Sequence, residues 1–224
     1  MTIDPGKEFE HFSVADLPKL INPGDVVVAN NTKVFPARFF GQKESGGNVE
    51  VLIERLVDDR TVRAFIKASK APGIGAVLKM KGGFLLTVDS RRHDLFVLRT
   101  EPSVNILEMA NKHGHTPLPP YIKRKDTIED RRRYQTVFAK DLGSVAAPTA
   151  GLHLDWQLIN SIVDRKATWC EITLHVGAGT FAPVRVDNIE EHKMHSEYYK
   201  ISENVVDKIK QAKANGSKII AVGT

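Results

Sequence analysis

Between residues 41 and 100, short apolar segments alternate with turn residues. Apolar side chains occupy every second position in several of these segments, for example at Val49, Val51 and Ile53. Alternation with this period is typical of strands that bury one face. About five or six such strands, separated by Gly, Pro and Asp, predict a small β-barrel or sandwich.

A different pattern begins after about residue 100, where apolar residues recur at helical spacing. Helices are predicted over Val104–Lys112 and Asp155–Arg165, and a third follows the N-cap Ser202 and reaches Asn215. Apolar runs at 167–176 and 218–222 predict strands. An order of strand, helix and strand is typical of a parallel sheet in α/β proteins.

The α/β pattern surrounds the all-β pattern, because the apolar run Val26–Ala29 near the start also predicts a short buried strand. We therefore expect an α/β body with an inserted small all-β, barrel-like domain. The body would be discontinuous, with residues 1–40 and 110–224, and the inserted domain would comprise residues 41–109. A chain of 224 residues is long enough for two modest domains.

Composition narrows the class of protein. Hydrophobic residues make up 42% of the chain, which is enough to build a core and excludes disorder for most of it. Cys170 is the only cysteine, and this excludes a disulfide framework and a four-cysteine metal site within the chain. The histidines are scattered and form no HExxH motif, so we expect no bound metal.

Nothing in the sequence predicts contact with a membrane. No charge-free stretch approaches the roughly 20 apolar residues of a spanning helix, and the first ten residues lack the apolar run of a signal peptide. We expect a cytoplasmic protein without a membrane partner, and we expect it to be a monomer. The chain stops at Val222–Thr224, directly after an apolar strand, where ligand loops form in open α/β sheets, so the sequence is expected to be incomplete.

The net charge of +5 is concentrated in one segment. Between Tyr121 and Lys140, seven Lys and Arg residues stand against three acids, so this segment carries most of the excess. A phosphate-rich partner favours such a patch because binding releases counterions. The alternative is a solvated face on which these charges pair with one another.

The glycine-rich loops match no common nucleotide fingerprint. Gly177 and Gly179 follow a predicted strand, but Ala182 stands where a dinucleotide fingerprint needs a third glycine. Pro183 opposes the helix that should follow. The chain also lacks a P-loop and a GxSxG elbow. These absences argue against a nicotinamide or flavin cofactor and against an α/β-hydrolase.

Two polar stretches, Ala147–His153 and His175–Thr180, are rich in small residues and are attached to predicted regular elements. Loops on rigid elements are the usual place for a site, and backbone N–H groups near a helix start suit an anion or a polar small molecule. We expect the two stretches to line one cleft. The alternative is that each is a tight turn that requires small residues.

Six segments carry distinct motifs: Val28–Arg38, Gly114–Ile122, Asp130–Phe138, Gly143–His153, Leu174–Phe181 and His192–Tyr198. In this order they resemble the S-adenosylmethionine:tRNA ribosyltransferase-isomerases of queuosine biosynthesis. Asn31 stands where that family usually has Asp. Members of the family extend further at both ends, so the resemblance implies a chain truncated at both ends.

Members of that family transfer the ribosyl part of S-adenosylmethionine to 7-aminomethyl-7-deazaguanine at the tRNA wobble position. Isomerisation of the ribosyl group gives epoxyqueuosine, and adenine and methionine are released. The resemblance implies this activity, with S-adenosylmethionine and tRNA carrying the precursor base as partners. Because S-adenosylmethionine is consumed, no cofactor is implied. The sulfonium acidifies the adjacent ribose carbon, so a general base is needed, and adenine leaves with the help of a general acid.

The matching segments contain side chains of the types that this chemistry needs. Candidates for the base and the acid, with individual roles left open, are His153, His175, His195 and Glu197. Substrate-binding candidates are Arg38, Thr149, Gly151, Gly177, Gly179 and Thr180. Candidates for tRNA binding are Lys123, Arg124, Arg131, Arg132 and Arg133. The competing hypothesis is a non-catalytic tRNA- or RNA-binding module, which explains the barrel and the basic segment but not the histidine-bearing loops.

Overall fold

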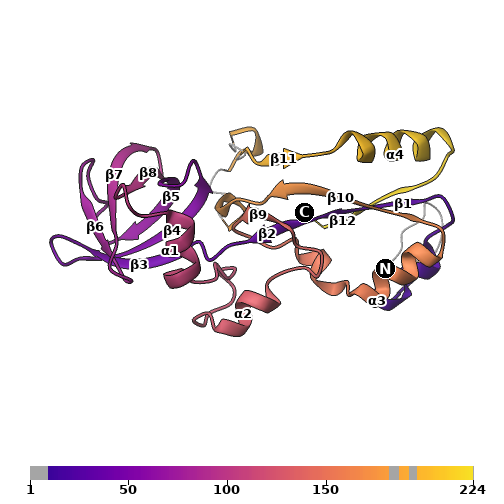
Figure 1. The fold of residues 1–224 in the computed structure, drawn as a ribbon, viewed down its shortest axis with the longest axis horizontal. Coiled ribbons are helices and arrows are strands. Elements are labelled where there is room, and N and C mark those ends of the chain that lie inside the picture. The colour runs from indigo at the N-terminus through magenta and orange to yellow at the C-terminus, as the bar shows by residue number, and fades with distance from the viewer. Residues whose placement is uncertain (1–9, 182–186, 192–195, 224) are drawn as a thin grey trace.

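A computed structural model describes residues 10–181, 187–191 and 196–223, which form a β-barrel and an α/β body (Figure 1). The barrel lies at one end of the long axis and the body at the other. The chain passes from the body to the barrel through strand β2 (Thr32–Val34). This arrangement confirms the predicted fold class, an α/β body combined with a small all-β unit.

The barrel is closed, and every neighbouring pair of its strands is antiparallel. The alternation seen in the sequence places Val49, Val51 and Ile53 inside, where they join one continuous apolar core. Helix α1 (Ile106–His113) packs Ile106 and Ala110 against the same core. The strands, in their order around the barrel, are β3 (Arg38–Lys43), β4 (Asn48–Leu56), β5 (Thr61–Ala68), β8 (Leu95–Thr100), β7 (Leu85–Arg92) and β6 (Val77–Met80).

The main sheet of the body has β1 (Val26–Asn30) at its centre, parallel to both of its neighbours. β1 is buried along its whole length, which explains why it is a continuous apolar run rather than an alternating one. β11 (Tyr198–Lys200) pairs antiparallel with the far side of β10 (Thr168–His175). The remaining strand of this sheet is β12 (Ile219–Val222).

Helices cover both faces of this sheet. Val26 and Val28 of β1 pack with Val205 of α4 (Glu203–Ala214), and Val27, which points the other way, packs with Ile162 of α3 (Trp156–Asp164). Figure 1 shows α3 and α4 on opposite sides of β1 and β10. The sheet is therefore the middle layer of a three-layer α/β unit.

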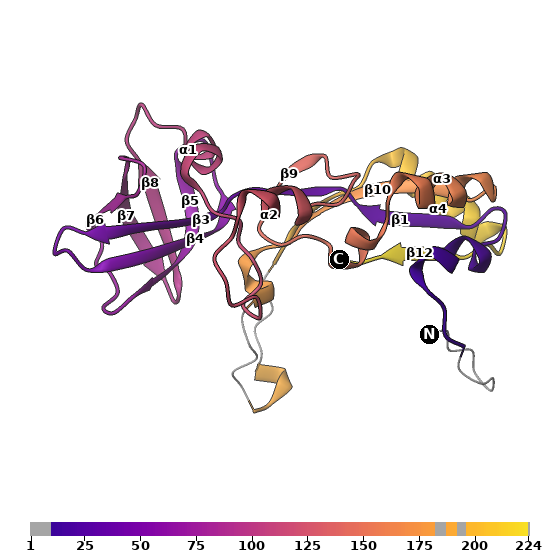
Figure 2. The ribbon, with the colours of Figure 1, turned by 90° about the horizontal axis from the view of Figure 1, so that it is seen from below.

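A second, two-stranded sheet connects the body with the barrel. β2 pairs in parallel with β9 (Asp141–Ser144), and helix α2 (Ile128–Arg133) lies beside this connection (Figure 2). This sheet was not expected from the sequence pattern, and a helix at α2 was considered only in the alternative that the charges of the basic segment pair with one another. The remaining elements are the 3₁₀ helices η1 (Val14–Leu20), η2 (Thr149–His153), η3 (Ala178–Phe181) and η4 (Ile189–Glu191).

Capping residues set the helix starts. The helix predicted from Val104 begins at Ile106, because the side chain of Asn105 accepts the backbone N–H groups of Leu107 and Glu108. Ser202 caps α4 as expected. The barrel strands run from Arg38 to Thr100, and the division of the chain at residues 41 and 109 stays a prediction. Among the described residues, no helix combines the length and the apolar character of a membrane span.

Candidate active site

His175 is the last residue of β10, at the carboxyl edge of the main sheet. Its Nδ1 lies 2.8 Å from Oγ1 of Thr32, and its ring stacks on Tyr198 with ring centres 5.4 Å apart. Gly143 lies against the other part of the ring, where an added Cβ would come within 2.6 Å of Nε2. The imidazole is therefore fixed in position by β2, β9 and β11.

Asn30 holds the two parallel strands together at this edge. Its Oδ1 accepts the backbone N–H groups of Leu174 and Thr32, at 3.0 and 3.1 Å, and its Nδ2 donates to the carbonyl of Leu174 at 2.9 Å. The side chain thus replaces the strand ladder at the point where β1 ends. Since ligands of open α/β sheets bind beyond the carboxyl ends of the strands, His175 and Thr32 occupy a position suited to a site.

The protonation of His175 follows from its surroundings. Burial lowers the pKa of the imidazole below its ordinary value, and the negative charge of Asp141 partly offsets this effect. The imidazole is therefore neutral near pH 7. A neutral imidazole with a fixed orientation can accept a proton, which is the role of a general base.

Acidic side chains approach the loop after His175 from two directions. Oε1 of Glu197 accepts the backbone N–H of Gly177 at 3.0 Å. Glu54 of β4 is only 8% exposed, and its Oε1 would lie 3.2 Å from a Cβ added to Gly177. Arg55 donates to Glu54 at 3.4 Å and to the carbonyl of Ser196 at 2.7 Å, so it balances part of the negative charge. Asp141, whose charge acts on His175 itself, is the third carboxylate of this region.

Glu54 reaches the body because β4 is irregular at that point. The pairing of β4 with β5 shifts register between Ile53 and Arg55, so the strict alternation of the barrel is interrupted. Bulges of this kind re-aim side chains and are frequent near active sites. Glu54, Thr32, Asp141 and Tyr198 were not predicted as site residues, although Thr32 and Tyr198 lie within two of the six motif segments. For Glu54 the available signal was a charged residue that follows the alternating apolar positions of its strand.

The residues just before the loop Ala147–His153 contact the segment that begins at His175. Val145 and Ala146 donate backbone N–H groups to the carbonyl of Val176, at 2.9 and 3.3 Å. His153 is exposed at the end of η2, and no hydrogen bond joins it to His175 in the described part of the chain. The shared cleft stays a prediction.

The small residues of the two loops differ in their surroundings. Gly151 is buried, and a Cβ there would lie 2.9 Å from Thr136 and 3.0 Å from Phe138, so close packing requires glycine. Thr149 and Thr180 are exposed, and Gly179 is half-buried within η3. His195 falls outside the described residues.

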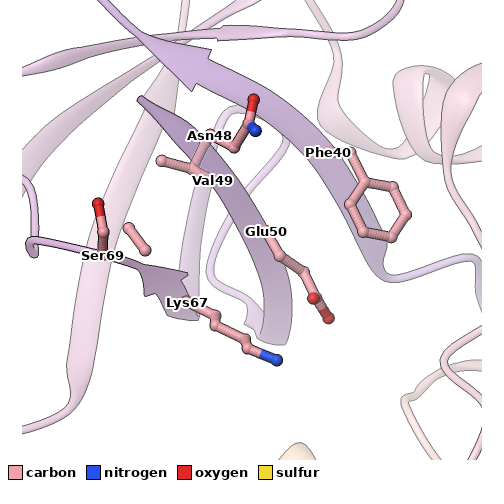
Figure 3. Close-up of a pocket in the computed structure, with 7 residues that line it drawn as sticks. Phe40, Asn48, Val49, Glu50, Lys67 and Ser69 are labelled. Carbon is pink, nitrogen blue, oxygen red and sulfur yellow. The ribbon is translucent and has the colours of Figure 1, made fainter. Parts of the chain in front are cut away.

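Arg38 lies on the barrel surface, away from the contacts of His175. Its Nε is 3.3 Å from Glu50 Oε1, and Nη2 donates to the carbonyl of Leu118 at 3.4 Å. Glu50 stands between Phe40 and Lys67 in a row across three strands, which lines a shallow hollow of about 470 Å³ (Figure 3). Arg38 is thus paired within the chain rather than joined to the histidine.

The basic segment is split between paired and free cations. Arg124 forms a two-pronged ion pair with Asp130, at 2.6 and 2.7 Å, which holds the pKa of that carboxyl well below its usual range. Arg132 pairs with Glu129 at 2.5 Å. Arg131 donates to the backbone carbonyls of Asn111 and Gly114. Lys123 and Arg133 are exposed and make no ion pair with any residue that the structure describes.

Metal ligation has no support within the described ranges, where no three His, Cys, Asp or Glu side chains are grouped closely enough to hold an ion. Cys170 is buried, and burial raises the pKa of its thiol, which disfavours the thiolate. The site therefore consists of a neutral imidazole, a hydroxyl and carboxylates between a parallel sheet and a barrel.

The chain is therefore a two-part α/β protein with a polar site where the sheet meets the barrel. The whole chain, residues 1–224, matches the family described as queuosine biosynthesis protein, and the chain belongs to that family. Among solved structures, it is similar to an S-adenosylmethionine tRNA ribosyltransferase from Thermotoga maritima. The identity is 18% and the TM-score 0.33, over 92% of this chain and 54% of that one. The chain thus spans about half the length of that relative.

Proposed function

We propose that this chain takes part in the transfer of the ribosyl group of S-adenosylmethionine to 7-aminomethyl-7-deazaguanine in tRNA. Isomerisation would give epoxyqueuosine, with release of adenine and methionine. The observation that carries the proposal is a neutral, oriented histidine among carboxylates, in a chain that belongs along its whole length to the queuosine biosynthesis family.

Charge supports the placement of S-adenosylmethionine beside His175. The molecule carries a sulfonium, an ammonium and one carboxylate, and so has a single net positive charge. Glu54, Glu197 and Asp141 give this region an excess of negative charge, since only Arg55 opposes them among the contacts described above. A cationic substrate is attracted to such a region, the more so where burial limits screening.

His175 is the proposed general base. It would remove the proton from the ribose carbon next to the sulfonium, and Thr32 and Gly143 would keep its ring in position. The electron pair left on that carbon would open the ribose ring and expel adenine, and the aminomethyl nitrogen of the tRNA base would add to the resulting unsaturated ribosyl chain with loss of a proton. Methionine would leave last, as a neutral thioether, displaced by the ribosyl oxygen that closes the epoxide. Adenine leaves with a proton, for which His153, His195 and Glu197 remain the candidate donors. Gly177, Gly179 and Thr180 are proposed to line the substrate.

The proposed contact with tRNA depends on the free cations of the basic segment. Arg133→Gln should reduce the slope of log binding constant against log salt by about 0.7–0.9, as expected for one lost phosphate contact. Arg132→Gln is the matched control, because Glu129 already pairs with that guanidinium. Equal slopes in the Arg133→Gln variant and the parent chain would remove Arg133 from the proposed RNA surface.

Adenine release tests the reaction itself. The 224-residue chain is mixed with S-adenosylmethionine and tRNA carrying the precursor base, and free adenine is measured by chromatography. The Thermotoga maritima relative serves as a positive control. Release that depends on both substrates supports the proposal. Binding of tRNA without adenine release, under conditions in which the relative reacts, would identify the chain as an RNA-binding module instead.

A further inference from the structure

A pocket separate from the His175 site lies where the barrel, α2 and the two-stranded sheet meet. Its volume is about 260 Å³, and we refer to it as the junction pocket. It is enclosed by elements far apart in sequence, because β2, α1, α2 and β9 all contribute. The residues that matter for its chemistry are Lys33, Phe35, Thr116, Arg131, Tyr134 and Leu142.

The junction pocket and His175 lie on opposite faces of the β2–β9 sheet. Thr32 is paired with Asp141, and both make contacts on the side of β10, with His175 and Thr173. Lys33 is paired with Leu142, and both line the junction pocket. Since successive side chains of a strand point to opposite faces, the two sites are separated by the sheet itself.

Positive charge dominates the junction pocket. Lys33 and Arg131 line it, and no Asp or Glu is among its lining residues; the nearby carboxylate of Asp126 is occupied by the backbone N–H of Thr116 and by His115, both at 2.8 Å. Arg131 is held by the carbonyls of Asn111 and Gly114, which use two of the five N–H groups of a guanidinium and leave three. A fixed guanidinium beside an ammonium favours an anion, above all phosphate.

Thr116 supplies a further polar group without an internal partner. The residue is only 4% exposed, and its hydroxyl makes no hydrogen bond within the part of the chain that the structure describes. A buried hydroxyl without a partner is costly, and a ligand that accepts its proton would relieve that cost.

Apart from Asn111 and Gln135, whose amide is bonded to the backbone of Val34, the rest of the lining is largely apolar and limits the size of the ligand. Phe35 and Tyr134 are buried, and Leu142 is partly exposed at the rim. The volume equals that of about nine water molecules, at roughly 30 Å³ each, and lies just below the range of ~300–1,000 Å³ for drug-sized ligands. One nucleotide combines, on this scale, an anionic phosphate with a flat base whose faces stack on aromatic and apolar side chains and whose edges hydrogen-bond.

We propose that the junction pocket binds one nucleotide, either free or as part of an RNA strand. Lys33 and Arg131 would hold its phosphate, Thr116 would donate its hydroxyl proton, and the base would lie against Tyr134 and Leu142. S-adenosylmethionine is disfavoured here, because its net positive charge would face two lining cations and no carboxylate among the lining residues. The inference does not depend on ribosyl transfer, since the pocket lies across the sheet from His175.

Calorimetric titration with 5′-CMP tests the proposal in the absence of S-adenosylmethionine. Lys33→Gln should weaken binding about tenfold or more, because a charge-assisted hydrogen bond contributes about 1.5–3 kcal/mol. Lys210→Gln is the matched control, an exposed lysine of α4 outside the pocket. Absence of binding to the parent chain, or equal weakening in the two variants, would overturn the proposal.

Thr116→Val gives a second readout that does not rely on a charge. It should weaken 5′-CMP binding about two- to tenfold and leave the melting temperature unchanged or higher, since the hydroxyl has no internal partner to lose. Loss of stability without loss of binding would count against the site.

Competition by a short RNA oligonucleotide would identify an RNA strand as the source of the nucleotide. Binding of 5′-CMP without such competition would identify a free nucleotide. Adenine release is not measured, so this test is independent of the proposed reaction.

Discussion

The barrel and the body bury different kinds of side chain. The barrel has one continuous apolar cluster, whereas the body divides its apolar residues among several small ones. Among the described residues, most of the buried polar side chains belong to the body or its connections, and only Glu54 and Thr100 lie on barrel strands. Asn30, Thr32 and Thr173 gather where β1, β2 and β10 meet.

The difference follows from how the two parts are assembled. Barrel strands pair mostly with strands close in sequence, and their alternation is sufficient to form a core. The body joins segments up to 193 positions apart, as in the contact between Asp25 and Lys218, and hydrogen bonds of buried side chains fix the register there. The buried polar side chains that interrupt the apolar packing of the body therefore lie at the candidate site.

The sharpest test of this comparison replaces the histidine of the body. His175→Ala should lower single-turnover adenine release about 10²–10⁴-fold, the usual contribution of one acid–base group. Its Nδ1 contact with Thr32 makes a structural role the alternative, and that role would reduce the melting temperature instead. A variant that melts like the parent and still releases adenine within a few-fold of its rate would exclude His175 as the base.

In the barrel, the corresponding change acts on stability. Phe39 is 1% exposed and packs edge-on against Phe84, so Phe39→Ala should lower the free energy of unfolding by about 3–5 kcal/mol. Phe40→Ala is the matched control on the next position of β3, where the side chain points outward and is half-buried. Urea unfolding measures both, and equal losses would contradict the assignment of the core to one face.

Asn30→Ala tests the hydrogen bonds by which this side chain holds β1 and β10 together. Each of the three backbone groups that it leaves buried without a partner should cost about 1–3 kcal/mol, offset where water enters. Asn48→Ala, at an exposed position with one contact to Gln42, should change stability by less than about 0.5 kcal/mol. If the two variants unfold at the same denaturant concentration, the register of β1 and β10 does not depend on this side chain.

Sequence patterns predicted the parts of the molecule that local rules control. The alternation at Val49, Val51 and Ile53 predicted barrel strands, and β10 ends at His175 as expected. Glu54 was missed, because a register shift that alternation cannot reveal turns it toward Gly177. The junction pocket was also missed, since Lys33 and Leu142 become neighbours only through a parallel pairing of distant segments.

The basic segment shows the same limit. Charge alone grouped Arg124, Arg131 and Arg132 as RNA-binding candidates, but each guanidinium already has a partner within the chain. Pairing of Arg132 with Glu129 at helical spacing was the alternative stated for this segment, and the structure shows it. The pairing of Arg124 with Asp130 depends on the turn before α2, which the sequence pattern did not predict.

The smallest expected effect concerns pH. Burial lowers the pKa of His175 in the folded chain, whereas the unfolded chain retains the ordinary value near 6.5. Above that pH both states are neutral, and the full stability is present. As the pH falls below about 6.5 towards the folded-state pKa, the unfolded state takes up the proton first, so stability is lost.

His175→Gln, which does not titrate, should remove this part of the acid sensitivity. The expected change in the free energy of unfolding is less than about 1 kcal/mol, because the ring is only half-buried. Urea unfolding of the parent chain and the variant between pH 5 and 8 measures the difference, in which the other histidines cancel. Parallel curves would mean that the imidazole is not desolvated in the folded chain. Burial would then not lower the pKa of His175, and it would not explain a neutral base at the edge of the sheet.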